Sequence, residues 1–166
     1  MISEKDKINT ELKTLLVSKN EDEKSPEKEI TLKNLTKHGL WVLYFYPKDS
    51  TPGCTLQARN IRDNLESLSS HKIQIYGISR DSHQSHCKFI KKENVNFNLL
   101  SDHTGKVSEN FGVWVEKNMY GKKYMGIQRT TFLIKKDMIV GVIKKVDTKN
   151  HAEQILDLLK EKKIIK

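Results

Sequence analysis

The chain has 166 residues and is 36% hydrophobic, which suits one domain with a single core. Thirty Lys and Arg residues against 21 Asp and Glu residues give a formal net charge of +9. The lysines are scattered among acidic neighbours, and no arginine cluster is interleaved with aromatic residues. We therefore interpret the charge as a solvated lysine-rich surface and expect no nucleic-acid partner.

No apolar run approaches the ~20 residues that a membrane span needs. Residues 1–16 lack the apolar core and the small-residue cleavage site of a signal peptide. The two cysteines, Cys54 and Cys87, are too few for a disulfide scaffold and too far apart for a CxxC motif. We expect a cytoplasmic protein in a reducing compartment, with no membrane association.

Residues 1–13 are charged and are expected to be frayed or weakly helical, because Ile8 and Leu12 are spaced for one helical face. Residues 40–46, LWVLYFY, are apolar or aromatic at every position, which is typical of a strand buried on both faces. Pro47 ends this strand, since it has no N–H to donate to a neighbouring strand. Ahead of it, the pattern predicts strands at 15–17 and 29–32 and a helical turn at 32–35.

From Pro52 onward the apolar residues recur at helical spacing, with charged residues between them. Ser82 is placed to cap a second helix, and Asn150 is placed to cap a final amphipathic helix. The remaining pattern predicts strands at 72–79 and 97–100, a short helix at 105–111, an exposed hairpin or loop at 116–125, and a hairpin of strands at 129–134 and 139–145.

The order of these elements favours one α/β domain. Strands alternate with helices, which indicates a mixed sheet covered by helices. We expect this domain to span residues 29–166 and residues 1–28 to form a charged extension with a short strand. No internal repeat is present.

The stretch between the buried strand and the next helix places a cysteine at the start of that helix. Residues 48–51 form a polar turn, and Pro52 follows where a missing N–H costs nothing. Gly53 and Cys54 then fall in the first helical turn. A thiol there meets unpaired N–H groups and the positive end of the helix dipole, both of which favour the thiolate. The pattern therefore predicts a reactive cysteine rather than an inert core cysteine.

At Pro47, Thr51 and Cys54 the sequence resembles a peroxiredoxin. The active-site pattern of that family is Pro, three residues, Thr or Ser, two residues and Cys, and it stands here as PKDSTPGC. The runs YFYPKDSTPGCT, GISRDS, LLSDHTGKV and GIQRTTFLI are similar to the bacterioferritin comigratory protein, or peroxiredoxin Q, subfamily, over about residues 31–159. The resemblance implies a thioredoxin-like three-layer α/β/α sandwich with a central mixed β-sheet. It also implies thiol-dependent reduction of hydrogen peroxide and organic hydroperoxides, without a cofactor.

The resemblance assigns roles to individual residues. Cys54 matches the peroxidatic cysteine, Thr51 the residue whose hydroxyl contacts thiolate and peroxide, and Pro47 the proline that shields the site from water. Arg129, in GIQRTTF, matches an arginine that arrives from a distant strand. The chemistry agrees, because attack on a peroxide builds charge on the departing oxygen and needs donors aimed at it. Candidate donors are the N–H groups of Gly53 and Cys54, the Thr51 hydroxyl and the Arg129 guanidinium, and the product is a Cys54 sulfenic acid.

The second thiol departs from the subfamily pattern. Many relatives carry a resolving cysteine five residues after the first, where this chain has Arg59. Others carry it at the position of Ile90, three residues beyond Cys87. Two interpretations stay open: Cys87 resolves Cys54 through an intramolecular disulfide after local unwinding, or Cys87 is an inert apolar residue and an external thiol resolves Cys54.

The resemblance also suggests thioredoxin as the reductant and a monomer or weak dimer. An alternative is a low-turnover peroxide-sensing or holdase-like binding protein that uses the same cysteine. A thioredoxin-type disulfide oxidoreductase is disfavoured by the absence of CxxC. A basic nucleic-acid binder would be recognised by steeply salt-dependent affinity.

Other titratable residues are interpreted as structural. His83 and Cys87 are four residues apart on one predicted helix, a spacing that can hold a metal, and His86 lies nearby. No second cluster completes such a site, so we expect surface histidines and no metal. Asp49 and Asp81 could be paired acids, but their flanks indicate a turn and a helix cap.

Overall fold

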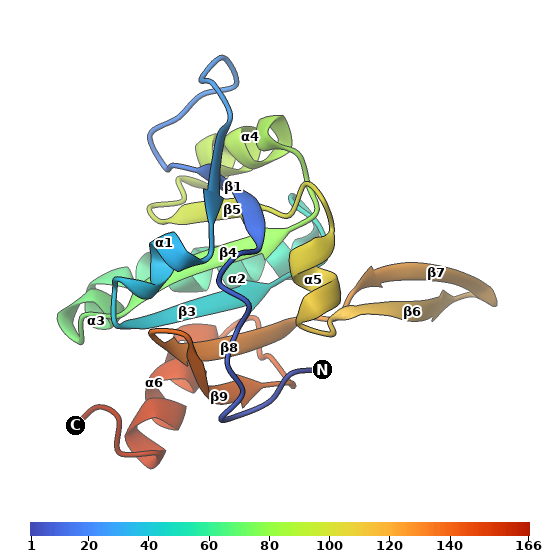
Figure 1. Ribbon diagram of the computed structural model, residues 1–166. Helices are drawn as coiled ribbons and strands as arrows, with labels where there is room; N and C mark the ends of the chain where they lie inside the picture. Colours follow the sequence, from blue (N-terminus) through green and yellow to red (C-terminus); the bar gives the residue numbers. More distant parts are fainter.

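The computed structural model describes residues 1–166 and is organised around a seven-stranded mixed sheet (Figure 1). The strand order is β2-β1-β5-β4-β3-β8-β9. The bounds of these strands are β1 Lys13–Val17, β2 Lys28–Thr31, β3 Leu40–Phe45, β4 Gln74–Ser79, β5 Asn98–Ser101, β8 Thr130–Lys135 and β9 Met138–Ile143. Strands β3, β4 and β5 are mutually parallel, whereas β1 and β8 run antiparallel to their neighbours. The sheet is therefore mixed, as the sequence predicted.

Two helical layers cover the sheet (Figure 1). The six helices are α1 Lys33–Thr36, α2 Pro52–Asp63, α3 Leu65–Ser70, α4 His83–Glu93, α5 Lys106–Asn110 and α6 His151–Glu161. Residues of α2, α3, α4 and α6 share one apolar cluster with one face of the sheet, and residues of α1 and α5 share a second cluster with the other face. This arrangement confirms the predicted three-layer α/β/α sandwich. None of the helices is both long enough and apolar enough to cross a bilayer.

Strand β3 connects the two clusters because it is apolar on both faces. Val42 and Tyr44 belong to the cluster beneath α2 and α6, whereas Trp41, Leu43 and Phe45 belong to the opposite cluster. All five side chains are at most 1% exposed. The alternation of side chains along a strand thus places both cores on one central element. The C-terminal end of β3 is the edge from which the chain enters the candidate site.

A two-stranded hairpin of β6 (Trp114–Met119) and β7 (Lys122–Ile127) projects from the domain beside α5 (Figure 1). The sequence predicted an exposed hairpin or loop here, and the hairpin is confirmed. The turn residue Tyr120 is 99% exposed, which fits a segment that extends into solvent.

The apolar face that begins at Pro52 is divided between two helices. The chain breaks at Asn64, whose side-chain amide donates to the carbonyl of Asn60 at 2.8 Å, and α3 then continues to Ser70. Leu56, one of the periodic apolar residues, is 39% exposed and lies outside the core. Periodicity therefore located the helical region and placed one of its apolar residues on the wrong side.

The expectation for the first residues was wrong. Residues 1–12 are not helical, and residues 5–8 run along β9, where the Lys5 N–H donates to the Ile139 carbonyl and the Ile8 N–H donates to the Asp137 carbonyl, each at 2.8 Å. Strand β9 is an edge strand with free backbone N–H and C=O groups. Pairing with it forms more backbone hydrogen bonds than an isolated helical turn could. Ile8 is consequently 6% exposed. Strand β1, which also lies within residues 1–28, pairs with both β2 and β5.

Replacing Ile8 tests this packing. Ile8→Ala should lower the free energy of unfolding by roughly 2 kcal/mol or more, because it leaves a cavity under the N-terminal segment. Lys7→Ala, at an exposed neighbour, should change it by less than about 0.5 kcal/mol. Denaturant unfolding of the two variants makes the comparison, and equal effects would contradict the packing described.

Candidate active site

Cys54 lies in the first turn of α2, where the sequence predicted it. The chain leaves β3, turns at Ser50 with a positive φ of 63°, and enters the helix through Thr51, whose φ and ψ are −87° and 155°. Pro52 occupies the first helical position. The N–H groups of Gly53 and Cys54 make no hydrogen bond within the chain, so both can donate to a group at the helix start.

Arg129 brings a positive charge to this sulfur from 75 residues away in the sequence. Its Nη2 donates to Cys54 Sγ at 3.4 Å, and its Nη1 donates to the Gln57 side-chain oxygen at 2.5 Å. The approach follows from sheet register, since Thr130 pairs with Phe45 at the end of β3. Cys54 is 2% exposed, so little water screens the guanidinium charge at the sulfur.

Gly53 gives the guanidinium room to approach. A Cβ on residue 53 would lie 3.1 Å from Arg129 Nη2. This distance is tighter than ordinary van der Waals contact. A side chain here would therefore require the guanidinium to shift by a few tenths of an ångström, and the glycine before Cys54 avoids that shift.

Thr51 and Pro47 flank the same loop. The Thr51 hydroxyl donates to the Lys48 carbonyl at 2.8 Å, which leaves its lone pairs free to accept a hydrogen bond. The structure shows no hydrogen bond between Thr51 and Cys54. Pro47 is half-buried and lies two residues beyond the end of β3. Both residues thus border the helix start, but the side-chain hydrogen bond to the sulfur comes from Arg129.

Gln57 was missed in the sequence analysis. It is fully buried and lies three residues after Cys54 on α2. The signal was the spacing, because residues i and i+3 share one helix face, and a buried glutamine needs partners for its amide. Its side chain accepts from Arg129 and holds one end of the guanidinium while the other end faces Cys54.

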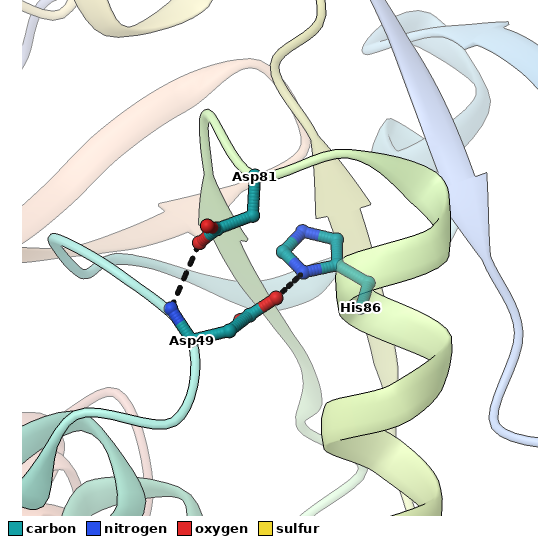
Figure 2. A group of neighbouring side chains, drawn as sticks. All are labelled: Asp49, Asp81 and His86. Atoms are coloured by element: carbon teal, nitrogen blue, oxygen red, sulfur yellow. Dashed lines mark hydrogen bonds and ion pairs between the residues drawn. The ribbon is translucent and has the colours of Figure 1, made fainter.

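A buried acid–imidazole pair ties the site loop to α4 (Figure 2). His86 Nδ1 lies 2.7 Å from Asp49 Oδ2, and His86 Nε2 lies 2.8 Å from the Leu100 carbonyl. A carbonyl can only accept, so Nε2 carries a proton, and a second proton must lie between Nδ1 and the carboxyl oxygen. His86 and His83 are 0% and 1% exposed, so the expectation of surface histidines was wrong.

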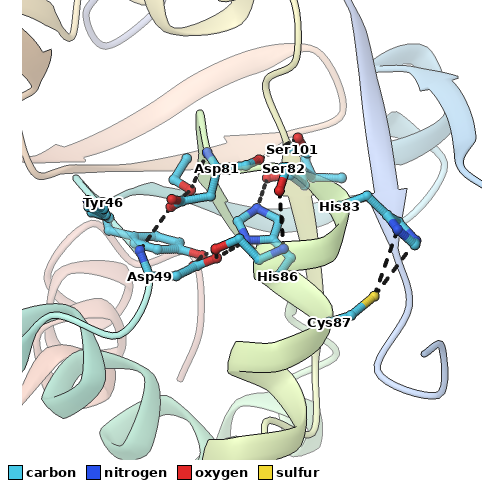
Figure 3. Close-up of polar contacts among 12 residues, drawn as sticks. Tyr46, Asp49, Asp81, Ser82, His83, His86, Cys87 and Ser101 are labelled. Carbon is cyan, nitrogen blue, oxygen red and sulfur yellow. Dashed lines mark hydrogen bonds and ion pairs between the residues drawn. The ribbon is translucent and has the colours of Figure 1, made fainter. Parts of the chain in front are cut away.

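The same carboxylate holds further groups (Figure 3). Asp49 accepts from the Tyr46 hydroxyl at 2.6 Å and from the Ser85 hydroxyl at 2.8 Å, and its N–H donates to Asp81 at 2.9 Å. The ligand-type atoms of Asp49, Asp81 and His86 all lie within 4.8 Å of one another. Each of these side chains is already hydrogen-bonded within the chain. The cluster therefore acts as a structural tie that no single segment of sequence could reveal.

Cys87 lies apart from this tie on the same helix, 3% exposed (Figure 3). Its sulfur is 3.4 Å from the Asp22 carbonyl and 3.7 Å from His83 Nε2. It borders a cavity of about 700 Å³ between α4 and residues 19–24. Burial and the nearby carboxylates, first among them Glu21, raise the pKa of the Cys87 thiol from 9.0 to about 11. Both cysteines are free thiols.

Arg59, at the position where the resemblance places a resolving cysteine in many relatives, forms an ion pair with α4 instead. Its Nε donates to Glu93 at 2.7 Å, and Arg62 donates to the Glu93 carbonyl at 2.7 Å. Glu93 is the last residue of α4. These contacts fasten the C-terminal end of α4 to α2.

Comparison with known proteins identifies the family of this chain. Residues 9–143 match the model of the AhpC/TSA family. The chain is 47% identical to peroxiredoxin Bcp of Bacillus subtilis over 121 residues, which cover 72% of this chain and 77% of that protein. It is 46% identical to peroxiredoxin Bcp of Escherichia coli K12 over 121 residues, 72% and 78% of the two chains.

A solved structure of the bacterioferritin comigratory protein of Xanthomonas campestris superposes with a TM-score of 0.80 at 32% identity, over 96% of this chain and 98% of that one. The chain therefore belongs to the AhpC/TSA family. Within that family it is a peroxiredoxin of the Bcp, or peroxiredoxin Q, group and a thiol-dependent peroxidase. The family resemblance stated from sequence is confirmed.

Gly53→Ala tests the approach of Arg129 to Cys54. The added methyl group should displace the guanidinium and slow oxidation of Cys54 by peroxide about tenfold, because small misplacements at a reacting centre are costly. Thr55→Ala, on the same helix, serves as the control and should retain the parent rate. Stopped-flow oxidation kinetics give the comparison, and equal rates for both variants would show that the glycine is not required.

The environment of Cys87 predicts a pH dependence. The thiolate is the reactive form, so alkylation of Cys87 should keep rising about tenfold per pH unit beyond pH 9. It should level off only near the raised pKa of about 11. Labelling of a Cys54→Ser variant followed by mass spectrometry measures this, and a plateau near pH 9 would contradict the acidic, buried setting.

Proposed function

We propose that Cys54 is the peroxidatic residue and reduces hydrogen peroxide and organic hydroperoxides. Its thiolate attacks one peroxide oxygen, so that an S–O bond forms while the O–O bond breaks and two electrons pass from sulfur to the peroxide. The departing oxygen takes up the proton that the thiol gave up and leaves as water or an alcohol. The single observation that supports this assignment most strongly is the 3.4 Å contact between Cys54 Sγ and Arg129 Nη2 at a helix start.

The surrounding donors stabilise the charge that develops in this step. The Arg129 guanidinium keeps its charge at any physiological pH, so it favours both the thiolate and the developing oxyanion. The N–H groups of Gly53 and Cys54 have no other partner and can donate to the attacked peroxide. Thr51 has free lone pairs that can accept from the peroxide O–H, and Pro47 limits water at the loop.

Organic hydroperoxides belong in the proposed substrate class. The Xanthomonas campestris relative is described with alkyl peroxide reduction activity. Only the O–O–H group needs to reach the sulfur, and the donors named above recognise that group alone. The proposal therefore places no requirement on the remainder of the substrate.

Cys87 is the residue that we propose for the second step. Its thiol gives a proton to His83, whose ring nitrogen lies 3.7 Å away, and its sulfur attacks the sulfur of the Cys54 sulfenic acid. An S–S bond forms, the S–O bond breaks, and hydroxide leaves with that proton as water. The first turns of α4 must unwind for this, which requires the hydrogen bonds to Asp49 to break. In the alternative, an external thiol attacks Cys54 directly and Cys87 stays inert.

A thioredoxin-type dithiol is the reductant in this proposal. It supplies the two electrons that return a disulfide to two thiols. Two cysteines are too few for a disulfide scaffold, which supports a reducing, cytoplasmic location. We further propose a monomer or weak dimer, since all residues named in the reaction come from one chain.

A coupled peroxidase assay tests the first step. Cys54→Ser should abolish turnover, and Arg129→Ala should lower the rate of Cys54 oxidation by about 100-fold, the typical loss when an aimed donor is removed. Arg59→Ala is the control. It removes an arginine of α2 that bonds to Glu93 rather than to Cys54, and it should retain activity. Comparable losses in both arginine variants would contradict the specific role of Arg129.

The second step is tested with Cys87→Ser and two reductants. If Cys87 resolves Cys54, this variant should lose turnover with thioredoxin and keep it with a small thiol, because the small thiol can reach the sulfenic acid itself. Mass mapping of peroxide-treated parent protein should then find a Cys54–Cys87 linkage. Full thioredoxin-dependent turnover in Cys87→Ser would support the one-cysteine alternative.

The same assays separate the sensing or holdase-like alternative. A sensor would be oxidised stoichiometrically at Cys54 and would not turn over with any thiol reductant. Multiple turnovers per chain support the enzyme.

A further inference from the structure

Behind Arg129 a chain of buried polar groups continues away from the sulfur. Gln57 accepts from Arg129 at 2.5 Å, and its amide nitrogen lies 3.2 Å from His151 Nδ1. His151 Nε2 in turn lies 2.7 Å from the Thr131 hydroxyl. Gln57, His151 and Thr131 are all 0% exposed. These side chains contact one another directly, and together they link α2, α6 and β8 to one guanidinium.

The direction of each hydrogen bond in this series of side chains follows from which groups can donate and which can accept. Arginine can only donate, so the oxygen of the Gln57 amide must face Arg129 and its NH₂ group must face His151. His151 Nδ1 must then be the acceptor, which leaves the proton on Nε2, where it is donated to Thr131. A proton on Nδ1 would oppose the NH₂ group and favour a flipped amide, with NH₂ turned toward the guanidinium. The tautomer of His151 therefore determines whether Gln57 can hold Arg129.

The position of His151 is itself determined by contacts between two helices. His151 is the first residue of α6. One turn from Gln57 on α2, Asn60 accepts from the Ala152 N–H at 2.8 Å and donates to the Lys149 carbonyl at 2.8 Å. The start of α6 is thus joined to the helix that carries Cys54. The Tyr44 ring packs edge-on against the imidazole with centroids 5.4 Å apart, which restricts its rotation.

Its surroundings keep the imidazole neutral. Burial, with the positive charge of Arg129 as the second cause, lowers the pKa of His151 from 6.5 to about 3. The groups that face the ring are Gln57 from α2, Thr131 from β8 and Tyr44 from β3, and none of these carries a charge at neutral pH. The imidazole is therefore neutral near pH 7, and its hydrogen bond from the Gln57 amide then favours the tautomer with the proton on Nε2.

We propose that His151 is a positioning residue for peroxide reduction, which orients the Gln57 amide so that Arg129 faces Cys54. This rests on the proposed roles of Cys54 and Arg129. The segment that matches the family model ends at residue 143, so His151 lies beyond it. The residue touches neither sulfur nor peroxide, and its effect passes through Gln57.

Three variants test the proposal. His151→Leu removes both hydrogen bonds and should slow oxidation of Cys54 by hydrogen peroxide about 10- to 100-fold. His151→Asn keeps an acceptor near the position of Nδ1 and should restore most of the rate. Thr131→Val removes only the last hydrogen bond of the series, the one to His151, with little change in shape, and should slow oxidation several-fold. Thr14→Val is the matched control, because Thr14 is equally buried and bonds to Ser101 on the other side of the sheet.

Two readouts separate positioning from folding. Single-turnover oxidation is compared with alkylation of Cys54 by iodoacetamide, which has no O–O–H group for Arg129 to hold, so the ratio of the two rates should fall in His151→Leu and stay constant in Thr14→Val. In an Arg129→Ala background, His151→Leu should cause no further loss. An unchanged ratio in His151→Leu and Thr131→Val, or equal effects of Leu and Asn, would overturn the proposal. If Arg129→Ala itself does not slow oxidation, the proposed role of Arg129 fails instead.

Discussion

The contact between the Cys54 sulfur and the Arg129 guanidinium is the constraint on which the site depends. It requires two conditions that different parts of the fold supply. Strand β3 must end where α2 begins, so that the thiol meets free N–H groups, and β8 must lie antiparallel beside β3, so that Arg129 reaches the same point. Gly53 completes the arrangement by leaving space for the guanidinium. The sheet register is thus directly responsible for the chemistry.

The proposed disulfide requires α4 to move, although two contacts hold this helix in place. The loop before Cys54 is held to α4 by Asp49 and His86, and the far end of α4 is held to α2 through Glu93. The proposed disulfide with Cys87 can form only if the first of these ties is released. The other end is held by two contacts, the half-exposed Arg59–Glu93 pair, which contributes little on its own, and the hydrogen bond from Arg62 to the Glu93 carbonyl. Unwinding would then be confined to the first turns of α4.

Local sequence was sufficient where a single segment determines the outcome. The apolar run of β3, the helix start at Pro52 and an exposed hairpin or loop at 116–125 were all located from local pattern, because burial and turn chemistry act over a few residues. Arg129 came from the family resemblance, since a lone arginine at a strand end says nothing of its partner.

The failures share one cause, which is contact between distant segments. Residues 1–13 were expected to be frayed or weakly helical because the free edge of β9 cannot be read from their own spacing. His86 was expected at the surface because its partners, Asp49 and the Leu100 carbonyl, come from two other elements. Gln57 was passed over because its importance depends on Arg129 and His151 together.

The most direct measurement of the central claim is the rate of Cys54 oxidation by hydrogen peroxide in Arg129→Lys. Lysine keeps the positive charge but lacks the planar guanidinium that can face Cys54 and Gln57 at once. The account predicts a loss of about 100-fold, as for removal of an aimed donor. A rate equal to that of the parent protein would contradict it, because charge alone would then suffice and the geometry at the helix start would not matter.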